Sequence, residues 1–146
     1  MLQRLNRIPM DIRTLAVEPS KKLHLRDAND QLIYADEAKT LPVCVNLHSP
    51  GSKTYAKAKA AQNNRLLEKL KRKGKFEQSA EQSAAETAEF LADVTESWEN
   101  MQYGSIIETR ALSLAVYSDE SIGFISDQVN KELGDWSNFT RHSKAS

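Results

Sequence analysis

Residues 79–103 of this chain, SAEQSAAETAEFLADVTESWENMQY, carry its strongest helical pattern. The apolar side chains of this acidic, alanine-rich stretch recur every three or four residues, at Ala84, Ala88, Leu91, Val94, Trp98 and Met101. Such spacing places them along one side of an α-helix as an almost heptad seam. We therefore expect a helix from about residue 78 to residue 102, with Trp98 as a core anchor against a neighbouring helix or a sheet.

A second long helix is predicted directly before it. The segment HSPGS at residues 48–52 breaks the chain, and the Ser52 hydroxyl can accept a free N–H of the first helical turn. A narrow stripe follows at helical spacing, through Tyr55, Ala58, Gln62, Leu66 and Leu70. Gly74 is a natural stop, so we expect this helix to run from Ser52 to about Lys73.

The N-terminal third favours a small antiparallel sheet. KKLHLRD (21–27) and QLIYAD (31–36) alternate as strands do and are separated by a polar turn. LPVCVNL (41–47) is predicted to be a third strand, with Pro42 suited to a sheet edge or a first strand position. The expected sheet therefore has two or three strands within residues 21–47.

The C-terminal part begins with a stretch that allows two interpretations. SIIETRALSLAVY (105–117) favours a strand or a strand-like connector, with a helical turn through residues 108–115 as the alternative. Ser118 can then cap a short amphipathic helix that ends at Gly134. The apolar positions of this helix are Ile122, Ile125, Val129 and Leu133.

Length and composition fit one unit built from these elements. A chain of 146 residues suits a single domain with a modest core. Five glycines and four prolines are few, which favours long helices over many turns. We therefore expect a mainly α, α+β domain over residues 1–146. It comprises a small β-rich part (1–51), two long helices, basic and then acidic (52–103), and a short C-terminal helical segment (104–146).

The same sequence argues against membrane, metal and enzymatic functions. It lacks the run of about eighteen apolar residues that a membrane span requires, and its N-terminus lacks the apolar block of a signal peptide. Cys44 is the single cysteine, and the three histidines lie in separate segments. The sequence contains no motif typical of hydrolases, metalloproteases or phosphate-binding loops. We therefore expect a cytoplasmic protein without catalytic residues, metal or cofactor.

Charge is strongly segregated along the chain, although the net charge is zero. Residues 53–75 carry nine Lys or Arg and one acid, whereas residues 76–103 carry seven Asp or Glu and no base. The two helices can neutralise each other as an antiparallel hairpin within one protomer. Alternatively, the charged faces point outward and join copies head to tail. The residues for such contacts are Lys57, Lys69, Arg72, Glu86, Glu89 and Asp93.

A third use of the basic helix is nucleic-acid binding, as in a small regulator. Phosphates favour a basic surface, but Tyr55 and Phe76 are the aromatic residues available near this helix to stack on bases. The acidic neighbour would also repel phosphates. The sequence therefore favours protein partners over nucleic acid.

The order of these segments is similar to that of a known family. The similarity lies in LHSPGSKTYAKAKAAQNNR (47–65), ADVTESWENMQYG (92–104) and YSDESIGFISDQVNKELGDWSNF (117–139). Together, these stretches resemble the tail assembly chaperones of long-tailed bacteriophages. SIIETRALSLAV (105–116) departs from the pattern, because similar proteins have a short polar turn there.

The resemblance implies a non-enzymatic protein made in the host cytoplasm during virion assembly. Such a chaperone binds the tape measure protein, keeps it soluble, recruits tail tube subunits and is absent from the mature virion. The resemblance also implies self-association into a spiral or ring, and often a longer product made by frameshifting. The alternatives are the nucleic-acid-binding regulator and a structural component of the virion tail.

Large aromatic side chains are the candidates for partner contacts: Trp98, Tyr117, Phe124, Trp136 and Phe139. The last two follow a completed helix, on a further turn that Asp135 starts. Aromatic side chains held just beyond a rigid element are typical interface anchors. They can equally fold back to close the core, because a domain of this size has little apolar area to spare.

If the charged faces do join copies, self-association should weaken with salt, because exposed charges are screened beyond about 8 Å at physiological ionic strength. Sedimentation at low and high salt measures this effect. A mass that stays unchanged across that range would show that the two helices neutralise each other within one protomer.

Overall fold

The computed structural model describes residues 8–73 and 79–141. Within these residues the chain forms four α-helices and one three-stranded antiparallel sheet, which confirms the mainly α, α+β class. In chain order the elements are β1 (Ser20–His24), β2 (Cys44–His48), α2 (Lys53–Lys73), α3 (Ala80–Val94), β3 (Thr95–Glu99), α4 (Thr109–Ser118) and α5 (Gly123–Leu133). The short 3₁₀ helices are η1 (Ile12–Leu15), η2 (Glu120–Ile122) and η3 (Trp136–Phe139).

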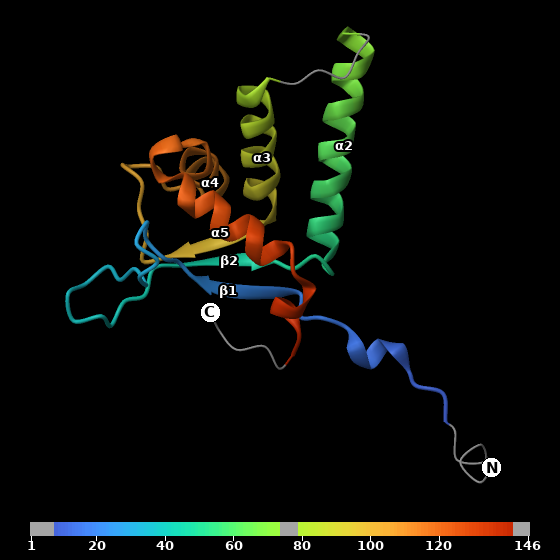
Figure 1. Cartoon of the computed structure of the whole chain (residues 1–146), viewed down its shortest axis with the longest axis horizontal. Coiled ribbons are helices and arrows are strands. Elements are labelled where there is room, and N and C mark those ends of the chain that lie inside the picture. The colour runs from blue at the N-terminus through green and yellow to red at the C-terminus, as the bar shows by residue number, and fades with distance from the viewer. Residues whose placement is uncertain (1–7, 74–78, 142–146) are drawn as a thin grey trace.

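The sheet and the helices form two layers (Figure 1). The strand order is β1-β2-β3, with β2 in the middle and both neighbours antiparallel to it. Val45 on β2 lies opposite Leu23 on β1 and Trp98 on β3. Helices α3, α4 and α5 lie on one side of the sheet, while α2 stands beside α3. The most deeply buried side chains include Leu25, Val45, Leu47, Leu91, Val94, Val129 and Phe139.

Helix α2 follows its predicted course. The Ser52 hydroxyl accepts the Tyr55 N–H at 3.1 Å and so caps the helix as expected. The helix continues to Lys73, and the stop predicted at Gly74 lies outside the described residues. Within the described ranges, no helix combines the length and the apolar composition of a bilayer-spanning segment.

The predicted C-terminal helix is confirmed as α5, but it has no side-chain cap of its own, and Ser118 ends α4. Asp119 caps the preceding turn instead, because its carboxylate accepts the Ser121 N–H at 2.9 Å and opens η2 directly before α5. Asp135 starts the next turn as predicted, since its carboxylate accepts a backbone N–H within η3. The amphipathic helix α5 therefore lies between two capped 3₁₀ turns, η2 before it and η3 after it.

The prediction that the acidic helix continues past Trp98 is wrong. Helix α3 ends at Val94, and residues 95–99 pair with β2 as strand β3. The Thr95 hydroxyl donates to the Leu91 carbonyl at 2.8 Å and so satisfies an acceptor of the last helical turn. Pairing with β2 replaces the helical hydrogen bonds that the next five residues would otherwise make. The apolar seam is thus helical through Val94, and Trp98 lies on a strand.

The sheet also draws on other segments than predicted. Residues 31–36 form isolated bridges, from Leu32 to Arg26 and from Tyr34 to Pro42, and not a strand of the sheet. The predicted strand at residues 31–36 is therefore wrong. Its place is taken by β3, because β2 already pairs along one edge with β1 and along the other edge with β3.

Of the two alternatives for residues 105–117, the helical one holds. The Glu108 carboxylate caps α4 by accepting two N–H groups of its first turn. Leu112 and Val116 lie one helical turn apart and are both buried. The expected strand is therefore absent from this described segment, because a capping carboxylate and burial at every fourth residue both favour a helix.

A buried polar contact joins the end of α3 to α4. Tyr117 is 6% exposed, and its hydroxyl oxygen lies 2.7 Å from that of Thr95. Because the Thr95 hydroxyl donates its own proton to Leu91, it accepts this bond from Tyr117. Burial raises the pKa of Tyr117, so the phenol stays neutral and keeps the proton that it donates.

Tyr117→Phe should destabilise the fold by about 1 kcal/mol, because it removes one partner of a buried hydrogen bond and keeps the ring. Tyr34→Phe removes the hydroxyl of a half-buried tyrosine between β1 and β2, and this control should change stability by much less. Urea unfolding followed by circular dichroism measures both variants. Equal effects would contradict the role given to the bond between Tyr117 and Thr95.

Candidate functional site

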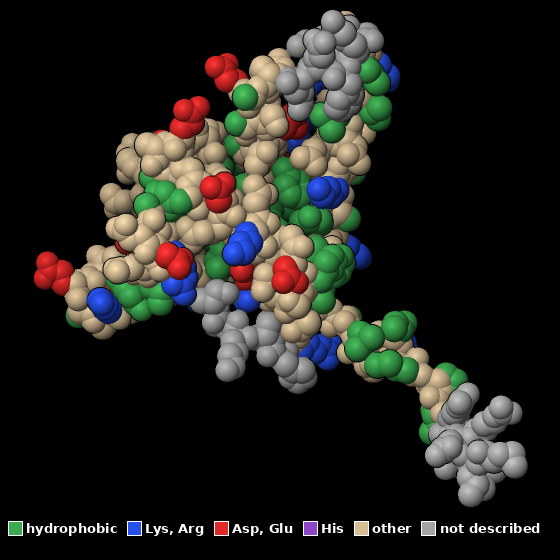
Figure 2. Space-filling model, in the orientation of Figure 1, with side chains coloured by type: hydrophobic (Ala, Val, Ile, Leu, Met, Phe, Trp, Pro, Cys, Tyr) green, Lys and Arg blue, Asp and Glu red, His purple; other side chains and the backbone are tan. Residues whose placement is uncertain are grey.

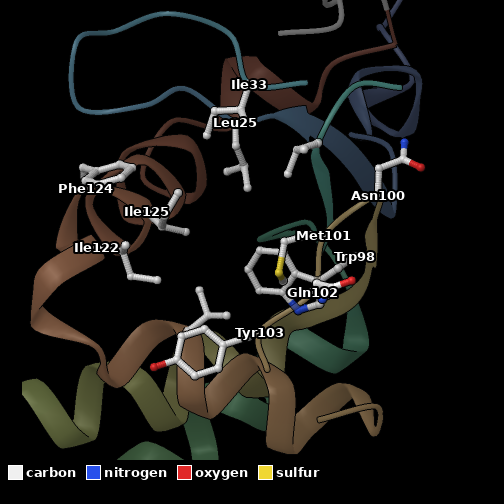
Figure 3. A pocket seen from close by; sticks show the side chains of 12 residues that line it. Leu25, Ile33, Trp98, Asn100, Met101, Gln102, Tyr103, Ile122, Phe124 and Ile125 are labelled. Atoms are coloured by element: carbon white, nitrogen blue, oxygen red, sulfur yellow. The ribbon is translucent and has the colours of Figure 1, made fainter. Parts of the chain in front are cut away.

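An apolar groove opens between the end of the sheet and the start of α5 (Figure 3). It has a volume of about 310 Å³, and its described lining residues carry no formal charge. The side-chain amides of Asn100 and Gln102 are the most polar groups of the lining. The apolar lining includes Leu25, Ile33, Trp98, Met101, Phe124 and Ile125. Such a composition suits an apolar side chain or helix face and not a charged substrate.

Two walls face each other across the groove (Figure 3). Ile122 and Phe124 form one wall, at the end of η2 and the start of α5. Met101 and Tyr103 form the other wall, in the segment that follows β3. Leu25, directly after β1, lies between the two walls. The groove therefore combines segments that are far apart in the sequence.

A residue in the left-handed conformation sets the direction of the second wall. Asn100 follows β3 with a φ of 59°, which Asn tolerates better than most residues. Its Nδ2 atom donates to the Pro42 carbonyl at 2.8 Å and ties the turn to the segment before β2. The turn ends the strand and directs Met101 and Tyr103 into the groove.

Hydrogen bonds hold the α5 wall to its neighbours. The Gln128 side chain accepts the Arg26 N–H at 2.7 Å and donates to the Arg26 carbonyl at 2.6 Å. This two-way contact resembles the pairing of a neighbouring strand. The Tyr103 hydroxyl donates to Asp119 at 2.7 Å and connects the two walls. The Ser121 hydroxyl, and then Tyr103, lower the pKa of Asp119, so this acceptor remains ionised.

Trp98 belongs both to the core and to the groove. Its ring centroid lies 5.5 Å from that of Tyr117, and its Nε1 atom donates to Ser113 Oγ at 2.8 Å. Ser113 in turn donates to the Thr109 carbonyl at 2.7 Å. The polar edge of the indole is thus satisfied inside the protein, while the half-buried ring lines the groove.

The five aromatic residues predicted for partner contacts do not gather at one place. Trp98 and Phe124 line the groove. Tyr117 and Phe139 are 6% and 1% exposed, so the structure assigns them to the core instead of an accessible surface. Trp136 is 57% exposed and lies beside Gly51, which follows the opposite end of β2. For the pair after α5, the core alternative holds for Phe139, and an interface role for Trp136 stays a prediction.

The basic and acidic helices contact each other within the protomer. Glu86 on α3 accepts Arg65 Nε at 2.9 Å and Lys69 Nζ at 3.5 Å, both from α2. Lys59 Nζ lies 4.6 Å from the ring centroid of Phe90 on α3. These contacts support the intramolecular hairpin alternative for the segregated charge.

Helix α4 also contributes to the neutralisation of α3. Arg110 Nη2 lies 2.6 Å from Glu89 and 3.1 Å from Asp93. The hydrogen bond to Glu89, followed by that to Asp93, raises the pKa of Arg110. Lys57 and Arg72 are exposed on α2. The other residues predicted for charged assembly, Lys69, Glu86, Glu89 and Asp93, are paired within one chain, which weakens that alternative.

Metal and thiol chemistry find little support in the described residues. Across residues 8–73 and 79–141, no group of three or more His, Cys, Asp or Glu is placed to hold a metal ion. Cys44 is 2% exposed, and burial raises the pKa of its thiol, which disfavours the reactive thiolate. The groove is therefore the feature of the described structure that best fits a functional site.

Sequence reasoning missed most residues of the groove. Leu25, Ile33 and Tyr103 line it without having been singled out, and Met101 was predicted only as a member of the helical seam. A local signal exists at residues 100–104, NMQYG, where Asn and Gly flank the two apolar side chains and both adopt positive φ. For Leu25 and Ile33 no comparable signal exists, because a backbone hydrogen bond from the Ile33 N–H to the Leu25 carbonyl brings them together.

Comparison of the chain with protein-family models, with curated proteins and with solved structures finds no match. No relative therefore supplies a ligand or a residue role for the groove. The geometry of the groove and the residue pattern of the sequence are therefore the observations that bear on function.

Asn100→Ala should destabilise the fold by about 1–2 kcal/mol, because it removes the bond to Pro42 and makes the left-handed turn more costly. Asn100→Gly is the matched control. It also removes the bond but adopts positive φ without strain, so it should cost less than the alanine. Thermal and urea unfolding compare the variants. A glycine variant as unstable as the alanine variant would show that the backbone conformation contributes nothing.

Proposed function

We propose that this protein is a tail assembly chaperone of a long-tailed bacteriophage. In this role it binds the tape measure protein, keeps it soluble and recruits tail tube subunits. The observation that carries the proposal is the open, uncharged groove of about 310 Å³. The resemblance of residues 47–65, 92–104 and 117–139 to this family supports the identity of the client.

The groove has the composition expected of a site for an amphipathic helix. A helix that lies in a groove is held by apolar side chains at positions i, i+3, i+4 and i+7. Trp98, Met101 and Phe124 are half-buried and offer apolar surface to such side chains. A long client with apolar helix faces would expose them to water before the tail forms. Covering these faces keeps the client soluble.

A second partner needs a surface that the client leaves free. Trp136 is 57% exposed and lies beside Gly51, which follows the end of β2 opposite the groove. Exposed tryptophans are frequent anchors at protein interfaces. We therefore assign Trp136 to the contact with tail tube subunits.

Nucleic-acid binding has less support than protein binding. Arg65 and Lys69 are engaged with Glu86, and Lys59 lies over Phe90. The acidic helix α3 stands beside α2 (Figure 1). Phosphates that approach α2 would meet this negative charge, which reduces the binding free energy that the exposed lysines can supply.

Phe124→Asp should reduce capture of the tape measure protein by about tenfold or more, because it places a charge in an apolar site. Co-expression with the tape measure protein of the same genome, followed by affinity purification, measures the captured client. Leu67→Asp is the matched control, since Leu67 is 53% exposed on α2, and it should capture the client like the wild type. Capture at wild-type yield by the Phe124 variant would show that the groove is not the client site.

Particle composition separates the chaperone from a structural tail component. Mass spectrometry of purified virions should detect tail tube subunits and not this chain. A stoichiometric amount of the chain in purified particles would favour the structural alternative.

A further inference from the structure

An N-terminal arm extends from the body and exposes four large apolar side chains (Figures 1 and 2). Ile8, Met10, Ile12 and Leu15 are 88, 64, 70 and 59% exposed. Single apolar side chains are ordinary on a protein surface, but these four follow one another within residues 8–15. Such a segment gains free energy when a partner removes it from water.

The arm presents these side chains as a group. Ile8 and Met10 precede η1, and both are exposed. In η1, Ile12 and Leu15 are three residues apart and therefore lie above one another. The Asp11 carboxylate caps this turn by accepting a backbone N–H. The outer part of the arm is thus already shaped for docking.

The base of the arm is attached to the body. The Glu18 N–H donates to the Phe139 carbonyl at 2.7 Å. Val17 packs against Gly51 so closely that a Cβ at position 51 would lie 2.6 Å from Val17 Cγ2. Pro19 restricts its own φ and the conformation of the residue before it. Together, these contacts set the direction in which the arm leaves the body.

The groove and the base of the arm lie at opposite ends of β1. The strand begins at Ser20, next to the arm, and ends at His24, next to the groove residue Leu25. At about 3.3 Å per residue, such a strand separates its two ends by roughly 15 Å. The arm leaves its base in the direction away from the groove (Figure 1). To fill its own groove, the arm would have to reverse its direction, whereas the groove of another copy requires no reversal.

We propose that the arm of one copy docks into the groove of a second copy. The chemistry matches, because aliphatic and thioether side chains meet a groove whose described lining carries no formal charge. Each copy has its arm and its groove at opposite ends, so the contact is heterologous and can repeat along a row of copies. Self-association and client binding then compete for one groove. This competition rests on the proposed function, whereas the contact between arm and groove does not.

Two full-length variants each remove one half of the contact. Ile12→Asp combined with Leu15→Asp charges the arm, and Phe124→Asp charges the groove. Circular dichroism checks that both remain folded, and Met101→Asp on the opposite wall replaces Phe124→Asp if the latter unfolds. Sedimentation velocity should show concentration-dependent oligomers for the wild type and monomers for each variant.

An equimolar mixture of the two variants is the decisive sample. One variant keeps an intact arm and the other an intact groove, so one contact can form but a row cannot. The mixture should therefore give a dimer of one copy of each variant and nothing larger. Leu67→Asp should assemble like the wild type. The proposal is overturned if the mixture or the wild type is monomeric. It is also overturned if the arm variant assembles normally.

Salt distinguishes this contact from charge-driven assembly. The mass of the wild-type oligomer should stay the same between low and high salt, because salt screens exposed charges and leaves apolar contacts intact. A mass that falls toward that of the monomer as salt increases overturns the proposal in favour of charged faces.

Competition is measured with a fluorescent amphipathic peptide of Leu, Ala and Gln as the client probe. The arm variant should bind it with a Kd roughly tenfold below that of the wild type, because its groove is free. Equal Kd values for the arm variant and the wild type would show that the arm and the peptide do not compete for the groove. If the mixture dimerises but no protein binds the peptide, the proposed function fails and the arm contact stands. If the peptide binds and the mixture stays monomeric, the arm contact fails and the proposed function stands.

Discussion

The change from helix to strand at Thr95 is the constraint on which the rest of the fold depends. Leu91 and Val94, in the last turn of α3, are fully buried, so the helix cannot slide along the core. The chain must then leave the helix at once, because the free edge of β2 lies beside it and pairs with residues 95 and 97–99. The Thr95 hydroxyl stabilises this junction through its bonds to Leu91 and Tyr117. The position of Trp98 on β3, where its Nε1 atom donates to Ser113 of α4, depends on this junction.

Packing neutralises part of the segregated charge of the sequence in the folded protein. The acidic helix α3 lies between two sources of positive charge, with Arg65 from α2 on one side and Arg110 from α4 on the other. Partly exposed ion pairs contribute little free energy each, but they favour one alignment of the three helices over others. The packing thus neutralises part of the segregated charge locally. The apolar surface of the groove and of the arm remains for contacts with partners.

That apolar surface is divided between the two ends of the sheet. The groove lies at one end, where the turn at Asn100 and the bond between Gln128 and Arg26 hold its walls apart. The arm leaves from the other end, where Gly51 allows Val17 to pack closely. A protein with complementary surfaces at opposite ends can form a row of copies. In such a row the arms occupy the grooves, so the row and the proposed client compete for the same apolar site.

The sequence alone determined the elements whose signals are local. Helices α2 and α5 and the turn η3 were predicted from capping residues and from apolar spacing, both of which can be found among adjacent residues. The tertiary structure decided whether residues 95–99 continue a helix and whether residues 31–36 join the sheet, since the hydrogen bonds of a strand are made with a distant segment. It also distinguished Trp136 from Phe139, two aromatic residues of one turn, because only the packing of η3 places one in solvent and the other in the core. The groove belongs to the same class: its residues come from several distant segments, and no local pattern states that they will meet.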